Sequence, residues 1–517
     1  MKRKILFSTA TEVNQGQGYF PQDIRRLYNI PDNLTGSGQA IGILEFSNGY
    51  SENDARQFWG LHGIEVSKLT FVSVDGTRND GGTSPDDEEA SLDLQWAGAI
   101  APQAQLIVYE ANAGETFATF SEAVVATLRY VLNDTTYQPS VLSISYGDAE
   151  ASFDQDSLVQ ISELIAELDQ KGVTVCISSG DQGAYGMHDT RGVPERHADA
   201  PASAPNAVAV GGTHLNPDGS ESAWTYYGPQ NGGATGGGFS AVFQKPSYQA
   251  TLAASGRGIP DVSLNADPAT GYQIVFQGQP AIVGGTSVSC PVFAGVVALL
   301  NERRAQLGKP PIRQLSSLLY THAKNLPYRD ITVGNNSFNG VTGYQAVPGW
   351  DACTGFGSID ATAFIEQLAA VDSPAPAPQP QPQSPPPAGG GPIVLPKPRS
   401  KYAVVRVLAT IQRVEADEDL HGVHHHRLLL RDVHVLAIRG ADPSIVKSYA
   451  FVAIRYGDDE GLKGPIPGLQ AGHSIELQGE YIPQNDAYPS VGNPGDPVIH
   501  FVHHPVGFVV YDGQTYD

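Results

Sequence analysis

The run GGTSVSCPVFAGVVALL, at residues 284–300, places two glycines and several hydroxyl side chains directly before a strongly apolar stretch. The apolar part predicts a helix that is buried on all sides. Backbone N–H groups and the helix dipole at the start of such a helix favour negative charge that develops there. We therefore interpret Ser287 as a nucleophile for acyl transfer. The alternative interpretation is that Thr286 or Ser287 only caps the helix, as Ser and Thr commonly do.

A proline, Pro291, stands four residues after Ser287 and so falls inside the predicted helix. An interior helix proline costs about 3 kcal/mol, because it has no N–H to donate and its ring crowds the preceding turn. A cost of this size favours a functional role for the segment over a simple cap.

Short β-branched runs at residues 40–46, 105–109, 141–145 and 173–177 alternate with longer helical patterns. This alternation predicts a parallel sheet that is covered by helices on both faces. One of those helices is expected at about residues 153–171. The predicted fold class is α/β.

A second helix is expected to begin at the sequence SPDD, residues 84–87, which combines a cap, a proline and acidic side chains of a first turn. It places Glu89 and Asp93 four residues apart, on one helix face. If the two carboxyl groups are buried, they are best accommodated by sharing a proton, which makes an acid–base device. If they are exposed, they belong to an ordinary solvated acidic face.

The serine segment resembles that of the subtilisin-like clan, but the clan's other two catalytic groups are missing. Where the first core strand of a subtilase ends in Asp, this chain has Glu45, and its nearest His-Gly pair, at His62, lacks the following Thr. Three motifs together resemble the sedolisin family of serine-carboxyl peptidases: Glu-x-x-x-Asp at residues 89–93, Ser-Ser-Gly-Asp at 178–181 and Gly-Thr-Ser at 285–287. This resemblance implies a subtilisin-like fold.

The resemblance implies a catalytic role for each of four side chains. Ser287 is the nucleophile, and Glu89 is the general base that takes its proton and returns it to the leaving amine. Asp93 holds Glu89 in orientation through a hydrogen bond. Asp181 is a protonated acid that donates to the oxyanion, together with the backbone N–H of Ser287. Without the other motifs, Asp181 would be interpreted as a turn residue.

A carboxyl base in place of histidine moves the expected working range to acid pH. Ordinary carboxyl pKa values lie near 4, whereas the pKa of imidazole lies near 6.5. A general base should titrate near the operating pH. We therefore expect a serine-type endopeptidase that hydrolyses polypeptides through an acyl-enzyme at roughly pH 3–5.

Two Gly-rich loops, at residues 328–336 and 347–355, each carry a carboxylate that suits calcium. Carboxylates, backbone carbonyls and water supply the six or more oxygen ligands that Ca²⁺ accepts. The resemblance implies one Ca²⁺ site with these ligands: the side chains of Asp330 and Asp351, and the carbonyls of Ile331, Val347 and Gly349. Val347 stands where the family commonly has glycine, which puts the local backbone angle in question. The alternative is a pair of surface turns.

Composition divides the chain into three parts. Residues 1–371 form the predicted peptidase domain, and the resemblance covers nearly all of it. Residues 372–400 are rich in Pro and Gly and form a predicted linker that favours extended polyproline II. In residues 401–517, alternating strand patterns such as 404–411 and 474–477 predict a small β-barrel. The motifs at residues 425–427, 479–481, 498–500 and 503–504 resemble those of a small bacterial OB-like domain of unknown function. Its many histidines have no spacing that is diagnostic of a metal site.

The charge balance limits the possible partners. The chain has 31 basic and 54 acidic residues, a net charge of −23, which disfavours nucleic acid and anionic membranes. No apolar run reaches the roughly 18 residues of a membrane span, and the first residues lack the apolar core of a signal peptide. Sedolisins are mostly secreted and carry a long prosegment that we do not find in this sequence, so the compartment stays undecided. We expect a monomer.

Two other classes of function stay open. One is a catalytically silent binding protein that keeps the peptidase fold, and the other is a binding module whose main function lies in the C-terminal domain. The silent protein is disfavoured because all four catalytic side chains are present: Glu89, Asp93, Asp181 and Ser287.

Overall fold

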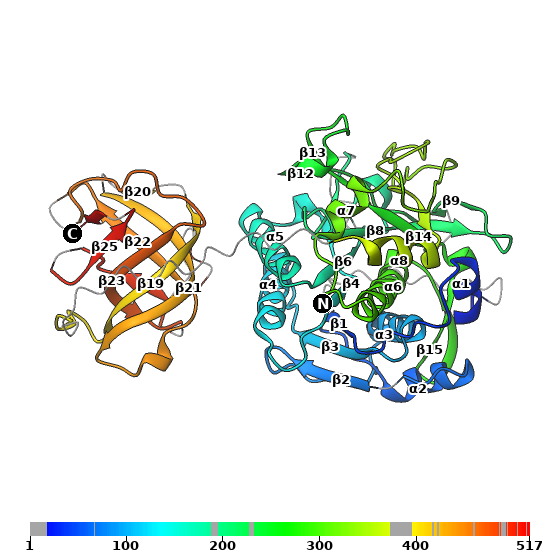
Figure 1. Ribbon diagram of the computed structural model, residues 1–517, viewed down its shortest axis with the longest axis horizontal. Helices are drawn as coiled ribbons and strands as arrows, with labels where there is room; N and C mark the ends of the chain where they lie inside the picture. Colours follow the sequence, from blue (N-terminus) through cyan, green and yellow to red (C-terminus); the bar gives the residue numbers. More distant parts are fainter. Residues whose placement is uncertain are drawn as a thin grey trace. The chain divides into compact units, whose positions relative to one another are not determined.

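Figure 1 shows the computed structural model of the chain. It describes residues 18–66, 68–187, 195–226, 232–372, 395–415, 418–420, 423–458, 461–484, 486–487, 493, 495–503, 505–512 and 514–516. The chain divides into two compact units, Met1–Ala377 and Pro378–Asp517. The boundary falls within the predicted linker, most of which, residues 373–394, lies outside the described residues.

The first unit is built on an eight-stranded sheet. Seven parallel strands follow the order β14-β8-β6-β4-β1-β3-β2, and β9 is antiparallel to β8. The strands are β1 (Ala40–Phe46), β2 (Lys68–Ser73), β3 (Gln105–Ala111), β4 (Val141–Ile144), β6 (Thr174–Ser178), β8 (Val208–Leu215), β9 (Glu221–Ala223) and β14 (Val262–Asn265). The predicted α/β class with a parallel sheet is confirmed.

Helices cover both faces of this sheet (Figure 1). On one face α1, α2, α3, α6, α7 and α8 share a core that includes Trp96 and Phe293, and on the other face α4 and α5 share a core around Phe120 and Ile165. The helices are α1 (Pro21–Leu27), α2 (Glu52–Leu61), α3 (Glu88–Ile100), α4 (Phe117–Asn133), α5 (Gln155–Gln170), α6 (Thr286–Gln306), α7 (Leu315–Thr321) and α8 (Ala361–Ala370). None of these helices is long and apolar enough to cross a membrane.

Helix α6 holds the serine segment in the middle of this unit. Every residue from Thr286 to Glu302 is buried, which confirms the helix predicted to be buried on all sides. The helix contacts α3 and α8 and the strands β1, β4, β6, β8 and β14. Its first turn meets the segments that leave β4 and β6. This is the carboxyl edge of the sheet, where parallel α/β proteins place their sites.

Short strand pairs complete the first unit. They are β5 (Asp148–Ala149) with β7 (Asp199–Ala200), β10 (Thr225–Tyr226) with β11 (Gly233–Ala234), β12 (Gly238–Gln244) with β13 (Gly256–Ile259), β15 (Tyr272–Phe276) with β16 (Gln279–Val283), and β17 (Tyr328–Arg329) with β18 (Ser358–Ile359). The β15–β16 hairpin is fastened to α3, because the Gln95 amide bonds both the N–H and the carbonyl of Val275, at 2.9 and 2.7 Å.

The second unit contains a closed five-stranded barrel. Strand β19 pairs with β21, β21 with β22, β22 with β24, β24 with β23, and β23 again with β19. Side chains such as Val407, Val452 and Leu477 fill its core. The strands of this unit are β19 (Ala403–Val414), β20 (Glu418–Leu420), β21 (Val423–Arg439), β22 (Ala450–Tyr456), β23 (Ser474–Ile482), β24 (Val498–His500), β25 (Phe508–Tyr511) and β26 (Gln514–Tyr516). The predicted small β-barrel is confirmed, and its likeness to OB-like domains stays a prediction.

Candidate active site

Ser287 occupies the first turn of α6, almost completely buried at 4% exposure. The helix N-cap is Gly285, so the interpretation of Thr286 or Ser287 as a simple cap is wrong. Gly285 has a φ of 113°, and a Cβ added to it would lie 2.6 Å from Asp181 Oδ2. Only glycine fits this backbone position without strain. The second glycine of the serine segment thus lets the acid and the nucleophile approach each other.

Glu89 and Asp93 lie one turn apart on α3, and both are fully buried. The alternative of a solvated acidic face is therefore wrong. Ser84 caps the short 3₁₀ turn Pro85–Asp87 that leads into the helix. Burial raises the pKa of Asp93 well above its ordinary value, and a hydrogen bond from Ser145 opposes this rise. Two carboxyl groups in such surroundings are best accommodated when they hold a proton between them.

A third buried carboxyl group, Glu45, belongs to the same cluster. It lies in β1 with no exposed surface and accepts a short hydrogen bond from the Tyr146 hydroxyl, which in turn accepts one from Asn48 Nδ2 at 3.0 Å. Burial and then the charge of Asp93 raise the pKa of Glu45 well above its ordinary value. Sequence reasoning noted Glu45 but gave it no role. Its signal was a charged residue within an otherwise apolar core strand.

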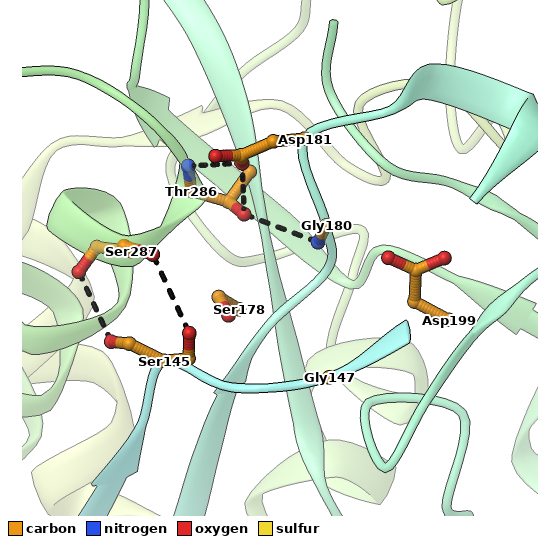
Figure 2. Close-up of a pocket in the computed structure, with 8 residues that line it drawn as sticks. All are labelled: Ser145, Gly147, Ser178, Gly180, Asp181, Asp199, Thr286 and Ser287. Atoms are coloured by element: carbon orange, nitrogen blue, oxygen red, sulfur yellow. Dashed lines mark hydrogen bonds between the residues drawn. The ribbon is translucent and has the colours of Figure 1, made fainter. Parts of the chain in front are cut away.

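Asp181 follows β6 and faces the start of α6. The backbone N–H and the hydroxyl of Thr286 both donate to Asp181 Oδ1 at 2.8 Å, while Gly180 N–H donates to the same hydroxyl at 3.1 Å. Because Oδ1 accepts both bonds, a proton on Asp181 belongs on Oδ2. Figure 2 shows Asp181, Thr286 and Ser287 around one pocket.

Asp199, in β7, lines the same pocket, and sequence reasoning missed it (Figure 2). It is 3% exposed, and neither carboxyl oxygen has a hydrogen-bond partner in the described part of the chain. A Cβ on Gly180 would collide with it, at 1.7 Å from Oδ2. Burial, followed by the charge of Asp148, raises the pKa of Asp199 well above its ordinary value. Burying a carboxyl group without a hydrogen-bond partner costs free energy. A ligand that bonds Asp199 would recover part of this cost.

The two carboxylates of the predicted calcium site, Asp330 and Asp351, both accept hydrogen bonds from the loop that holds Val347 and Gly349. Gly349 N–H donates to Asp330 Oδ2 at 2.8 Å, and Val347 N–H donates to Asp351 Oδ2 at 2.8 Å. Val347 is not among the described residues with a positive φ, so the backbone is unstrained where the family commonly has glycine. Among the described residues, no group of three or more His, Cys, Asp or Glu side chains could hold a metal. A calcium site between Asp330 and Asp351 would therefore need backbone carbonyls as further ligands, and the expected ligand set includes three of them. Carboxylate and carbonyl oxygens are hard donors, which fit Ca²⁺.

Comparisons with known proteins identify relatives of this chain. A family model described as Subtilase family matches residues 43–356. Kumamolisin of Bacillus sp. (strain MN-32) is 39% identical over 358 residues, which cover 66% of this chain and 62% of the relative. Sedolisin of Pseudomonas sp. (strain 101) is 32% identical over 371 residues, with shares of 66% and 60%. Human tripeptidyl-peptidase 1 is 30% identical over 381 residues, with shares of 68% and 64%.

A solved structure agrees with these relatives. Pseudomonas sedolisin, a serine-carboxyl proteinase complexed with two molecules of pseudo-iodotyrostatin, is similar with a TM-score of 0.59 and 28% identity, over 69% of this chain and 98% of that chain. Fold and site thus define a subtilisin-like α/β protein with a serine and buried carboxyl groups at its centre. The chain belongs to the subtilase family and, within it, to the sedolisin family. It spans less than two thirds of the length of these curated relatives.

Proposed function

We propose that this chain is a serine-carboxyl endopeptidase that hydrolyses polypeptides at acid pH through an acyl-enzyme. The observation that carries the proposal is the position of Ser287, which shares a pocket with Asp181 at the start of a buried helix. Membership of the sedolisin family supports it. The silent binding protein is not favoured, because all four side chains that the chemistry needs are present in the chain.

In the proposed mechanism Glu89 activates Ser287. The Ser287 hydroxyl is directed at the Ser145 carbonyl, 3.5 Å away, at the limit of a hydrogen bond. The O–H bond has to turn from this carbonyl before Glu89 takes the proton and Oγ attacks the peptide carbonyl. The Ser287 N–H and protonated Asp181 would then stabilise the oxyanion. Glu89 returns the proton to the leaving amine, and water hydrolyses the acyl-enzyme after activation by the same carboxylate.

Two peptides of one sequence, one with a free and one with an acetylated N-terminus, test the proposed class of activity. An endopeptidase cleaves both at pH 4, whereas an enzyme that removes tripeptides needs the free amine. We expect comparable kcat/KM for the two peptides at pH 4 and much lower values at pH 7, measured by chromatography of the products. Activity on the free peptide alone would assign the chain a tripeptidyl activity instead.

We expect Asp199 to give this enzyme a preference for basic side chains. The side chain that precedes the cleaved bond must lie beside Ser287, and Asp199 lines that pocket with its carboxyl group unpaired in the described part of the chain. A cation there would favour the ionised acid and provide its missing partner. Acetylated peptides with Lys or Arg at this position should be cleaved about 10-fold or more faster than those with Leu. The charge-removing variant Asp199→Asn should abolish this preference, and an unchanged Lys to Leu ratio would contradict it.

We also propose that one Ca²⁺ ion binds between Asp330 and Asp351, with the carbonyls of Ile331, Val347 and Gly349 as further ligands. A ligand that binds only the folded state stabilises it by mass action. Dialysis against a calcium chelator should therefore lower Tm by roughly 5–10 °C. Added Ca²⁺ should restore Tm and Mg²⁺ should not, as measured by calorimetry at one pH. An unchanged Tm, with no metal found by elemental analysis, would count against the site.

A further inference from the structure

Pro291 has a structural consequence at the nucleophile. In a regular helix the N–H of residue 291 would donate to the carbonyl of Ser287, four residues earlier. Proline has no N–H, so this carbonyl must find its hydrogen bond elsewhere. The Ser145 hydroxyl lies 3.2 Å from it, on the segment that leaves β4 (Figure 2). The proline thus turns a helical carbonyl into an acceptor for a side chain of the active site.

The Ser145 hydroxyl has a second acceptor, because Asp93 Oδ1 lies 2.8 Å from it. A hydroxyl has one hydrogen to donate and lone pairs with which to accept. When Asp93 is ionised, Ser145 donates to it. When Asp93 carries its proton on Oδ1, Asp93 donates to Ser145, and Ser145 donates to the Ser287 carbonyl. The direction of this two-bond chain therefore depends on the protonation of Asp93.

We propose that Ser145 is a positioning residue that couples the protonation of Asp93 to the backbone of the nucleophile, and that Pro291 makes this coupling possible. The proposal rests on the proposed peptidase function and extends it to a side chain that has no role in the mechanism given above. Ser145 is 3% exposed, so its side chain is largely shielded from solvent. The coupling holds the first turn of α6 against α3 while the proton moves.

Several groups face Asp93 and share its electrostatic environment. Glu89 lies on the same helix, Glu45 reaches it from β1, and Cys290 faces it from α6. Tyr146 bonds Glu45 and therefore affects the same cluster. The hydrogen bond from Ser145 lowers the pKa of Asp93. Its loss should therefore shift the ionisation of the whole cluster to higher pH.

The test compares Ser145→Ala with Ser143→Ala. Ser143 is a buried serine two residues earlier on β4, and its hydroxyl contacts Cys290 Sγ instead, at 3.4 Å. We expect Ser145→Ala to lower kcat about 10- to 100-fold with KM within about twofold of wild type. The acid limb of the kcat/KM profile should move up by about 0.5–1 pH unit, the equivalent of one hydrogen bond. Ser143→Ala should leave the acid limb in place. Equal profiles for both variants would overturn the proposal.

Two further variants test the coupling to Asp93 and the role of Pro291, and a third, Ser287→Ala, tests the proposed function separately. In an Asp93→Asn background, Ser145→Ala should cost less than about threefold in kcat, because the coupling partner is already gone. If Ser145→Ala lowered kcat as much in the Asp93→Asn protein as in the wild type, the proposed coupling would be overturned. Pro291→Ala restores an N–H for the Ser287 carbonyl and frees Ser145 for Asp93, so the acid limb should move to lower pH. A shift in the same direction as Ser145→Ala would overturn the role of Pro291. Peptide hydrolysis that survives Ser287→Ala would instead refute the peptidase assignment itself.

Discussion

Replacing Ser287 by Ala is expected to lower kcat for peptide hydrolysis at pH 4 by about 10⁴- to 10⁶-fold, since nucleophile and base act as one unit. Glu89→Gln should have a similar effect, because the amide keeps the shape of the side chain but cannot accept the Ser287 proton. Both side chains are buried, so the fold is checked by thermal unfolding of the same samples. The measurement is kcat on one fluorogenic peptide.

Glu88→Gln is the matched control for the base, because Glu88 precedes Glu89 on α3 and is only partly buried. Its kcat should stay within about twofold of wild type. Near-wild-type hydrolysis by purified Ser287→Ala or Glu89→Gln would remove these residues from the mechanism. If Glu88→Gln lowered kcat as much as Glu89→Gln does, the loss would come from a change to helix α3 in general and not from removal of the general base.

Stability is expected to fall as the pH rises from acid to neutral. Glu110, 2% exposed in β3, has a pKa raised to about 8 by burial and then by the charge of Asp80, and burial raises the pKa of Asp87 to about 6. The folded chain therefore keeps protons that the unfolded chain releases above about pH 4.5. This contribution is complete below the ordinary carboxyl pKa and is lost as the pH rises to about 8. The acid chemistry proposed above and the acid stability expected here would thus have one cause, the burial of carboxyl groups.

Glu110→Gln tests this pH dependence, because the amide is uncharged at every pH. Its Tm should match that of wild type at pH 4.5 and exceed it by about 5 °C at pH 8. Glu122→Gln, on the exposed side of α4, should follow the wild-type Tm at both pH values. A Glu110→Gln protein that loses as much Tm as wild type between pH 4.5 and 8 would show that Glu110 does not cause the loss.

The elements that carry the site could be predicted from local patterns. A continuous apolar run after two glycines predicted helix α6. A cap residue, a proline and acidic residues in the first turn predicted helix α3. The parallel sheet followed from strands that alternate with helices, and the structure has it. Each of these signals needs only neighbours in the sequence.

The groups that sequence reasoning missed act through contacts between distant segments. Ser145 bonds a carbonyl 142 residues away, and Asp199 matters only because β7 brings it to the pocket of Ser287. The pKa of Glu45 is raised by burial and then by the charge of Asp93, which lies across a sheet–helix interface. No local pattern marks such residues, because an ordinary Ser or Asp in a loop has the same sequence signature. For the same reason, the sequence does not identify the chemical class of a ligand for the C-terminal barrel.

The most direct test of the central claim is the mass of the covalent intermediate. An activated ester of an acetylated peptide is turned over at pH 4, the reaction is quenched in acid, and the protein is digested and mapped by mass spectrometry. The account predicts an acyl group on the peptide that contains Ser287 in the wild type, and none in Ser287→Ala. An acyl group on another residue, or ester and peptide hydrolysis that proceeds undiminished in Ser287→Ala, would contradict it.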